Sequence, residues 1–133
     1  MQQMIPYLMV DGAEEAGKFY SEAFEGEILE THRAGDIPGF PSPDAIIHLS
    51  IQTKYGLIFL ADSHPERTMK GNNTQIVFSM GSPEEVDSVV NSLREGAMVH
   101  MEPQNTFWGA YFATLTDKYG ITWQMNCQLD QKA

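Results

Sequence analysis

Residues 108–127 read WGAYFATLTDKYGITWQMNC, and apolar and polar side chains alternate on both sides of the sequence Asp117-Lys118-Tyr119-Gly120. An alternation with a period of two is typical of β-strands that have one buried face. The Asp-x-x-Gly centre is typical of a turn, because its Gly tolerates a positive φ. The stretch therefore predicts a β-hairpin, and it contains both tryptophans of the chain.

The hairpin has a fainter counterpart earlier in the chain, which indicates an internal duplication. An offset of 64 residues places Lys54-Tyr55-Gly56 on Lys118-Tyr119-Gly120. An offset of 70 residues places Glu25-Gly26, which ends a predicted helix, on Glu95-Gly96. Each copy is predicted to contain a strand, a helix and three further strands. The expected fold class is therefore α+β, with two βαβββ modules in tandem and mixed sheets.

The two modules are expected to form one domain of 133 residues, 42% of them hydrophobic, which is enough to build a core. Module one is expected at about residues 1–64, a polar linker at about 65–73 and module two at about 74–128. Strands outside the hairpin are predicted at 5–10, 27–33, 45–52, 57–62, 75–80 and 97–101, and loops at 35–43 and 102–106.

Each predicted helix has an apolar stripe and an N-terminal signal. Apolar residues recur at helical spacing in 13–24 and again in 86–93. Asp11 is expected to cap the first helix. The sequence Ser82-Pro83-Glu84-Glu85 is typical of a capping box with Pro at the first helical position.

Each helix is expected to cover one face of its sheet and to leave the other face as a concave, ligand-binding surface. Strand parity assigns nine residues to the helix-covered face: Ile47, Leu49, Ile51, Phe59, Tyr111, Ala113, Leu115, Trp123 and Met125. It assigns to the concave face Tyr7, His48, Ser50, Ser79, Thr114, Thr122, Gln124 and Asn126, with Ile5 and Gln75 beside them. A mostly polar face flanked by aromatic side chains predicts a small-molecule site.

Charge and cysteine content limit the classes of function. The chain has 8 Lys plus Arg against 18 Asp plus Glu, a formal net charge of −10, which disfavours nucleic acid and anionic lipid as partners. Cys127 is the single cysteine and allows no internal disulfide. The apolar run at 4–10 is too short for a membrane span and lacks the features of a signal peptide. We expect a cytoplasmic protein.

Four pieces of sequence together resemble the PhnB-like branch of the vicinal oxygen chelate superfamily, which includes glyoxalase I, bleomycin-resistance proteins and extradiol dioxygenases. These are Pro6-Tyr7-Leu8, Phe19-Tyr20, Trp108-Gly109 and the segment 116–126. The resemblance covers nearly the whole chain. It implies glyoxalase-like paired βαβββ modules, commonly arranged as a homodimer with cavities between sheets.

The resemblance also implies four metal-ligand positions, which fall on Ile5, Leu60, Gln75 and Gln124. Two are hydrocarbon and two are neutral amides, whereas divalent transition metals prefer imidazole, thiolate or carboxylate. The sequence therefore predicts no tight metal at these positions, although His48 with Gln75 and Gln124 remains an alternative set. We expect no nucleoside cofactor either, because the chain has no Gly-rich strand-to-helix turn.

Three candidate side chains have open roles. His48 is the only candidate general base, or else a histidine satisfied by hydrogen bonds to Ser50, Gln124 or the backbone. Trp108 is expected either to cap a ligand cavity or to pack against the helix face, while Trp123 is expected in the core.

Two functions follow from these expectations. The first is a metal-free protein that binds a small polar or aromatic molecule, as bleomycin-resistance relatives do. The alternative is a metal-dependent lyase, isomerase or dioxygenase acting on a small molecule. A pure assembly module, dimeric through its sheet edges, is a third class.

Overall fold

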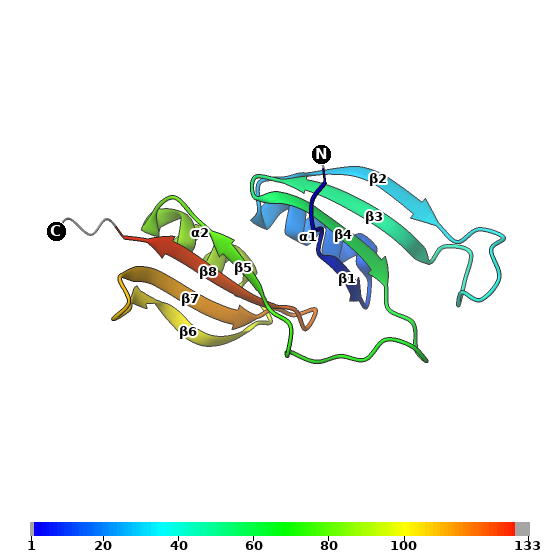
Figure 1. Ribbon diagram of the computed structural model, residues 1–133. Helices are drawn as coiled ribbons and strands as arrows, with labels where there is room; N and C mark the ends of the chain where they lie inside the picture. Colours follow the sequence, from blue (N-terminus) through cyan, green and yellow to red (C-terminus); the bar gives the residue numbers. More distant parts are fainter. Residues whose placement is uncertain (1, 130–133) are drawn as a thin grey trace. The chain divides into compact units, whose positions relative to one another are not determined.

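The computed structural model describes residues 2–129. The chain divides into two compact units, the first ending at Lys70 and the second starting at Gly71, and each is described here by itself. Both units have the same order of elements, one strand, one helix and three strands (Figure 1). The expected α+β fold with two tandem βαβββ modules is therefore confirmed. Among the described residues, neither helix has the length and apolar character needed to cross a membrane.

The first unit is a four-stranded mixed sheet with one helix. Its elements are β1 Tyr7–Val10, α1 Ala13–Ala23, β2 Glu27–Arg33, β3 Ile46–Thr53 and β4 Gly56–Asp62. The strand order is β1-β4-β3-β2, with β1 parallel to β4 and the other pairs antiparallel. Strand β1 therefore lies at one edge and β2 at the other (Figure 1).

The second unit repeats this arrangement. Its elements are β5 Ile76–Ser79, α2 Pro83–Leu93, β6 Met98–Asn105, β7 Ala110–Thr116 and β8 Thr122–Gln128. The strand order is β5-β8-β7-β6, with β5 parallel to β8. Strands β7 and β8 form the predicted hairpin, in register from Thr116 opposite Thr122 to Ala110 opposite Gln128. Strand β6 is longer than predicted, since it continues through the polar segment 102–105 that was expected to be a loop.

Each helix buries its apolar stripe on one face of its sheet, and that contact is the core of the unit. In the first unit, Leu49 of β3 packs so closely on Gly17 of α1 that a Cβ at Gly17 would lie 3.0 Å from the leucine Cδ1. In the second unit, Val86, Val90 and Leu93 of α2 are buried with Trp123 and Met125 of β8. Trp123 is fully buried, which confirms its expected place in the core.

The two helices begin differently. Ser82 caps α2 by accepting a hydrogen bond from the Glu85 backbone amide at 3.2 Å, which confirms the predicted cap, and Oε1 of Glu85 accepts from the Gly81 amide at 3.0 Å. The prediction that Asp11 caps α1 was wrong, because the N-cap position is Gly12 in a left-handed conformation (φ 81°). The Ala13 amide donates instead to Oδ1 of Asp62, 2.8 Å away at the end of β4. A long-range carboxylate thus replaces the local cap.

Two parity predictions in the first unit, for Phe59 and Ile47, were wrong, and Leu60 is misplaced as an implied metal-ligand position; strand register explains all three. Phe59 pairs with Ser50 and Tyr7, so its side chain lies on the face opposite the helix. Leu60 is fully buried on the helix side and is no open-face position. A bulge opposite His32 and Arg33 makes Ile47 an extra residue of β3, so Ile46 is the buried residue there.

A difference in turn length caused the misplacement of Phe59 and Leu60. In the first unit eight residues separate the paired Ser50 and Phe59, whereas in the second unit nine residues separate the equivalent pair, Thr114 and Gln124. The repeat therefore changes its offset by one residue at this turn. Phe59, which pairs with the β1 strand at Tyr7, is the structural counterpart of Gln124.

Candidate functional site

Each sheet has one face covered by its helix and one face left open. The first open face carries, from β1 and across the sheet, Tyr7, Met9, Phe59, His48, Ser50, His32 and Glu30. The second open face carries Val77, Ser79, Gln124, Asn126, Phe112, Thr114, Thr116 and Thr122. These two sets are named the first and second open faces below. The first is aromatic and the second consists mainly of amides and hydroxyls.

Three rings of the first open face contact one another edge to face. The centroid of the His48 ring lies 4.5 Å from that of Phe59 at an interplanar angle of 74°. Tyr7 lies 5.6 Å from each of them, at 70° to His48 and 84° to Phe59. Edge-to-face packing is the preferred geometry of aromatic pairs, so the three rings hold each other in place.

Hydrogen bonds orient the same cluster. The Tyr7 hydroxyl donates to the Ile47 carbonyl at 2.9 Å, and Nδ1 of His48 lies 3.2 Å from the same hydroxyl oxygen. Partial burial raises the pKa of Tyr7 above its usual value, so the hydroxyl keeps its proton at neutral pH. His48 is thus held by a tyrosine that the sequence analysis placed on the same face without predicting the contact.

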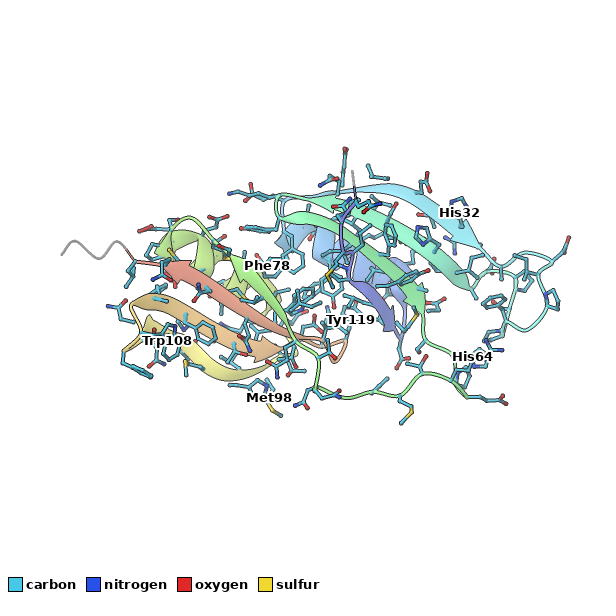
Figure 2. All side chains as sticks on the ribbon, viewed as in Figure 1. His32, His64, Phe78, Met98, Trp108 and Tyr119 are labelled. Carbon is cyan, nitrogen blue, oxygen red and sulfur yellow. The ribbon has the colours of Figure 1, made fainter. Side chains whose placement is uncertain are left out.

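A second histidine stands next to His48. The His32 ring on β2 lies 6.0 Å from the His48 ring, and its Nε2 lies 3.2 Å from Glu30 (Figure 2 labels His32). The register explains this pair, since His32 is opposite His48 across the β2–β3 ladder. Sequence analysis missed it because the bulge at Ile47 interrupts the parity count in this part of the sheet.

The second open face contains a pair of hydrogen-bonded amides. Nε2 of Gln124 on β8 donates to Oε1 of Gln75 at 2.7 Å. Gln75 is itself anchored, because its Nε2 donates to the Asn72 carbonyl at 3.1 Å. Both glutamines occupy positions where the family resemblance implies metal ligands, and here they bond to each other.

Next to the amides lies a short chain of hydroxyl groups. Thr122 is buried and its Oγ1 lies 2.7 Å from Oγ1 of Thr116. Nε2 of His100 on the edge strand β6 lies 2.8 Å from the same Thr116 oxygen. The buried Thr122 hydroxyl is therefore used in a hydrogen bond within the sheet. Thr114 and Asn126 are half-buried on the same face. His100 lies at the bulge in β6 between Val99 and Met101.

Trp108 lies at the entrance to β7 and is 47% exposed. Its ring, labelled in Figure 2, lies edge to face with Phe107 and Phe112, at centroid distances of 5.0 Å and 5.6 Å. Phe112 belongs to the second open face, so Trp108 is not packed against the helix side. Packing against the helix face is therefore excluded for this indole, and its role as a cap over a ligand cavity stays a prediction.

The nine predicted site residues fall into two groups. Tyr7, His48 and Ser50 belong to the first unit, with Tyr7 and His48 in direct contact. The other six belong to the second unit: Gln75, Trp108, Thr114, Thr122, Gln124 and Asn126. Their role in binding remains a prediction.

The residues at the implied metal positions do not suit a divalent ion. Within residues 2–129, no cluster of three or more His, Cys, Asp or Glu side chains is arranged to hold a metal. More important is the chemistry of the donors that are present. Two neutral amides and the hydrocarbon side chains of Phe59 and Leu60 supply no charge to offset the dehydration of an ion.

A shallow depression of about 590 Å³ lies on α2 in the second unit, and sequence analysis did not anticipate it. Glu84, Asp87, Ser88, Asn91 and Ser92 line it. One of these residues, Asp87, accepts a hydrogen bond at Oδ1 from the Tyr111 hydroxyl of β7 at 2.7 Å. This hydrogen bond joins helix and sheet, so we interpret the depression as part of the packing of α2.

Tandem βαβββ units, each with an open sheet face, define a class of small α+β proteins built by duplication. The chain belongs to the glyoxalase/bleomycin resistance protein/dioxygenase superfamily, whose family model matches residues 4–125. This membership confirms the resemblance found in the sequence.

Individual relatives agree with this assignment. The chain is similar to the crystal structure of protein PA1353 from Pseudomonas aeruginosa, with 29% identity and a TM-score of 0.86 over 98% of this chain and 100% of that one. It is also similar to the PhnB protein from Bacillus cereus, with 25% identity and a TM-score of 0.76 over 95% and 99%. Protein YjdN of Escherichia coli is 26% identical over 91% of this chain and 92% of its own length. The PhnB-like branch is thereby supported.

Proposed function

We propose that this protein binds a small polar or aromatic molecule on its open sheet faces and holds no tight divalent metal there. The observation that carries the proposal is the 2.7 Å hydrogen bond between Gln124 and Gln75. Where the resemblance implies metal ligands, the chain has two amides that are already hydrogen-bonded to each other. Superfamily membership and the PhnB-like relatives support the coarse function, the recognition of a small molecule.

The amide pair favours an organic ligand over an ion for a simple reason. Each amide of the pair retains donor and acceptor capacity beyond the bond between them, and such groups fix the orientation of a polar ligand. A metal would have to break the Gln75–Gln124 bond and the Asn72 contact while gaining only neutral oxygen ligands. The aromatic first open face offers flat apolar surface for the same class of ligand.

A second candidate is a metal-dependent lyase, isomerase or dioxygenase acting on a small molecule. The observation in its favour is the pair of imidazoles, His32 and His48, 6.0 Å apart beside Glu30. Imidazole and carboxylate are good ligands for transition metals. In such an enzyme His48 would be a metal ligand or the general base.

Elemental analysis of protein purified without chelator separates the two candidates. We expect less than about one tenth of an equivalent of zinc, nickel, iron or manganese, and thermal stabilisation by organic members of a metabolite and drug library. The matched control is His100→Ala, which removes an imidazole outside the His32–His48 pair. Stoichiometric metal that is lost in His48→Ala but kept in His100→Ala would overturn the proposal in favour of the enzyme.

We also propose a homodimer in the cytoplasm. Paired modules of this superfamily commonly dimerise, and the lone Cys127, which is buried, is compatible with a reducing compartment. Light scattering measures the oligomeric state. A mass close to twice 14.9 kDa is expected for the homodimer, and the mass of a single chain would contradict it.

A further inference from the structure

We propose that Tyr7 fixes the tautomer of His48, and that the first open face consequently selects aromatic ligands carrying an N–H or O–H donor. The choice of ligand class rests on the proposed small-molecule function. The tautomer does not, because it follows from the hydrogen bonds of the first unit alone. An experiment can therefore refute the ligand class without refuting the tautomer assignment.

The tautomer follows from counting protons. A tyrosine hydroxyl has one proton, and in Tyr7 that proton is donated to the Ile47 carbonyl at 2.9 Å. Nδ1 of His48 lies 3.2 Å from the same oxygen, so it must be the donor in that contact. A neutral imidazole has one N–H and one lone pair. With the proton on Nδ1, Nε2 is the acceptor.

The surroundings of His48 determine what this acceptor recognises. Phe59 and Tyr7 both meet the imidazole edge to face, so a flat ring beside Nε2 finds aromatic neighbours. Partial burial strengthens a hydrogen bond at Nε2 relative to one in open water. An aromatic ligand with an N–H or O–H group can pack against the rings and also donate a hydrogen bond to Nε2. An N-alkylated analogue of the same shape can only pack against the rings.

The charged and titratable groups that face His48 are few. Tyr7 comes from β1 and is neutral, His32 and Glu30 come from β2, and β4 contributes the hydrocarbon ring of Phe59. On β1 and β4 the imidazole is therefore bordered by neutral rings, which favours a neutral aromatic ligand.

Long-range ¹H–¹⁵N NMR of histidine-labelled protein tests the tautomer directly at pH 8. We expect His48 to show the pattern of a protonated Nδ1, and Tyr7→Phe to abolish it by removing the oxygen that accepts this proton. Tyr55→Phe is the matched control, since Tyr55 lies in the β3–β4 turn. An Nε2–H pattern in the unmodified protein, or no change in Tyr7→Phe, would overturn the assignment.

The ligand class is tested by NMR titration with indole and 1-methylindole, which differ in one N–H group. We expect indole to shift the His48 and Phe59 resonances with an affinity at least about fivefold higher than that of 1-methylindole, the difference expected for one net hydrogen bond. In Tyr7→Phe and His48→Phe this preference should disappear. Equal affinities, or no shift with either compound, would overturn the donor selection and leave the NMR result on the tautomer unaffected. Binding of library compounds to the second face alone would still support the proposed function.

Discussion

The indole Nε1 of Trp123 donates to Oδ2 of Asp117 at 2.7 Å, and this buried bond ties the hairpin turn to the core of the second unit. The other carboxylate oxygen accepts from the backbone amides of Tyr119 at 2.8 Å and Ile121 at 3.2 Å. Asp117 is only 4% exposed, and its carboxylate accepts hydrogen bonds from these three N–H donors, as a buried acceptor requires. The hairpin segment that resembles the family therefore has a structural role, which is to hold the turn against the core.

Asp117→Ala is expected to destabilise the second unit by about 2–4 kcal/mol, because it leaves the Trp123 indole N–H and two amides without their acceptor. Both tryptophans belong to this unit, so fluorescence-detected urea unfolding reports on it specifically. The control is Asp36→Ala in the exposed 35–43 loop, which should change stability by less than about 0.5 kcal/mol. Equal effects of the two substitutions would show that the Asp117 contacts do not stabilise the turn.

The register of β4 predicts opposite consequences for two neighbouring residues. Leu60→Ala should cost about 2–4 kcal/mol, because Leu60 is fully buried under α1. Phe59→Ala should cost about 1–2 kcal/mol, because Phe59 is half-buried on the open face, yet it should weaken ligand binding there at least about fivefold. Unfolding followed by circular dichroism and titration with indole measure the two effects. If Leu60→Ala abolished binding and left stability unchanged, the register described here would be wrong.

Tyr111 and Asp87 provide a prediction about pH. The hydrogen bond to Asp87, then burial and the negative charges of Asp87 and Glu84, raise the pKa of Tyr111 above its usual value. A raised pKa in the folded state means that this contact stabilises the protein below the ordinary tyrosine pKa, and that the stabilisation is lost as the pH rises through the raised value.

Asp87→Ala should consequently lower the pKa of Tyr111 toward 10, as measured by NMR of labelled tyrosine ring carbons. Tyr7 serves as the internal control in the same titration. Its pKa is raised by burial within the other unit and should not respond to the substitution. A Tyr111 titration unchanged in Asp87→Ala would contradict the hydrogen bond between α2 and β7.

Local patterns were sufficient to predict most of the fold. The alternation in residues 108–127 predicted the hairpin, and the Ser82 capping box predicted the start of α2, since both depend on contacts between residues close in sequence. The cap of α1 could not be predicted in this way. Its acceptor, Asp62, is 49 residues from the Ala13 amide and comes near it only because β1 and β4 are parallel neighbours.

The candidate site was predicted less completely, because its geometry depends on bulges and turn lengths. One extra residue in the 117–121 turn shifts the repeat, and it is this shift that brings Phe59 rather than Leu60 to the open face. The bulge at Ile47 likewise pairs His48 with His32. A period-two count cannot detect either irregularity. The amide pair was predictable as two positions, but the bond between Gln75 and Gln124 was not.

Gln75→His combined with Gln124→Glu tests whether this pair occupies a position suited to a metal. The double variant replaces two neutral amides, whose side chains approach to 2.7 Å, with an imidazole and a carboxylate. We expect Ni²⁺ or Zn²⁺ to raise its melting temperature by several degrees, because charged and imidazole ligands offset the dehydration of the ion. The unmodified protein should show no such rise.

The isosteric control for that variant is Gln75→Met with Gln124→Met, which keeps side-chain length and removes the amides. It should neither bind these metals nor orient a polar ligand on the second open face. Metal stabilisation of the unmodified protein that equals that of the double variant would mean that neutral amides suffice, and it would refute the argument from donor chemistry. If metal stabilises only the Gln75→His, Gln124→Glu variant, the position is suited to a metal. The unmodified protein then lacks metal affinity there because of its two amide side chains.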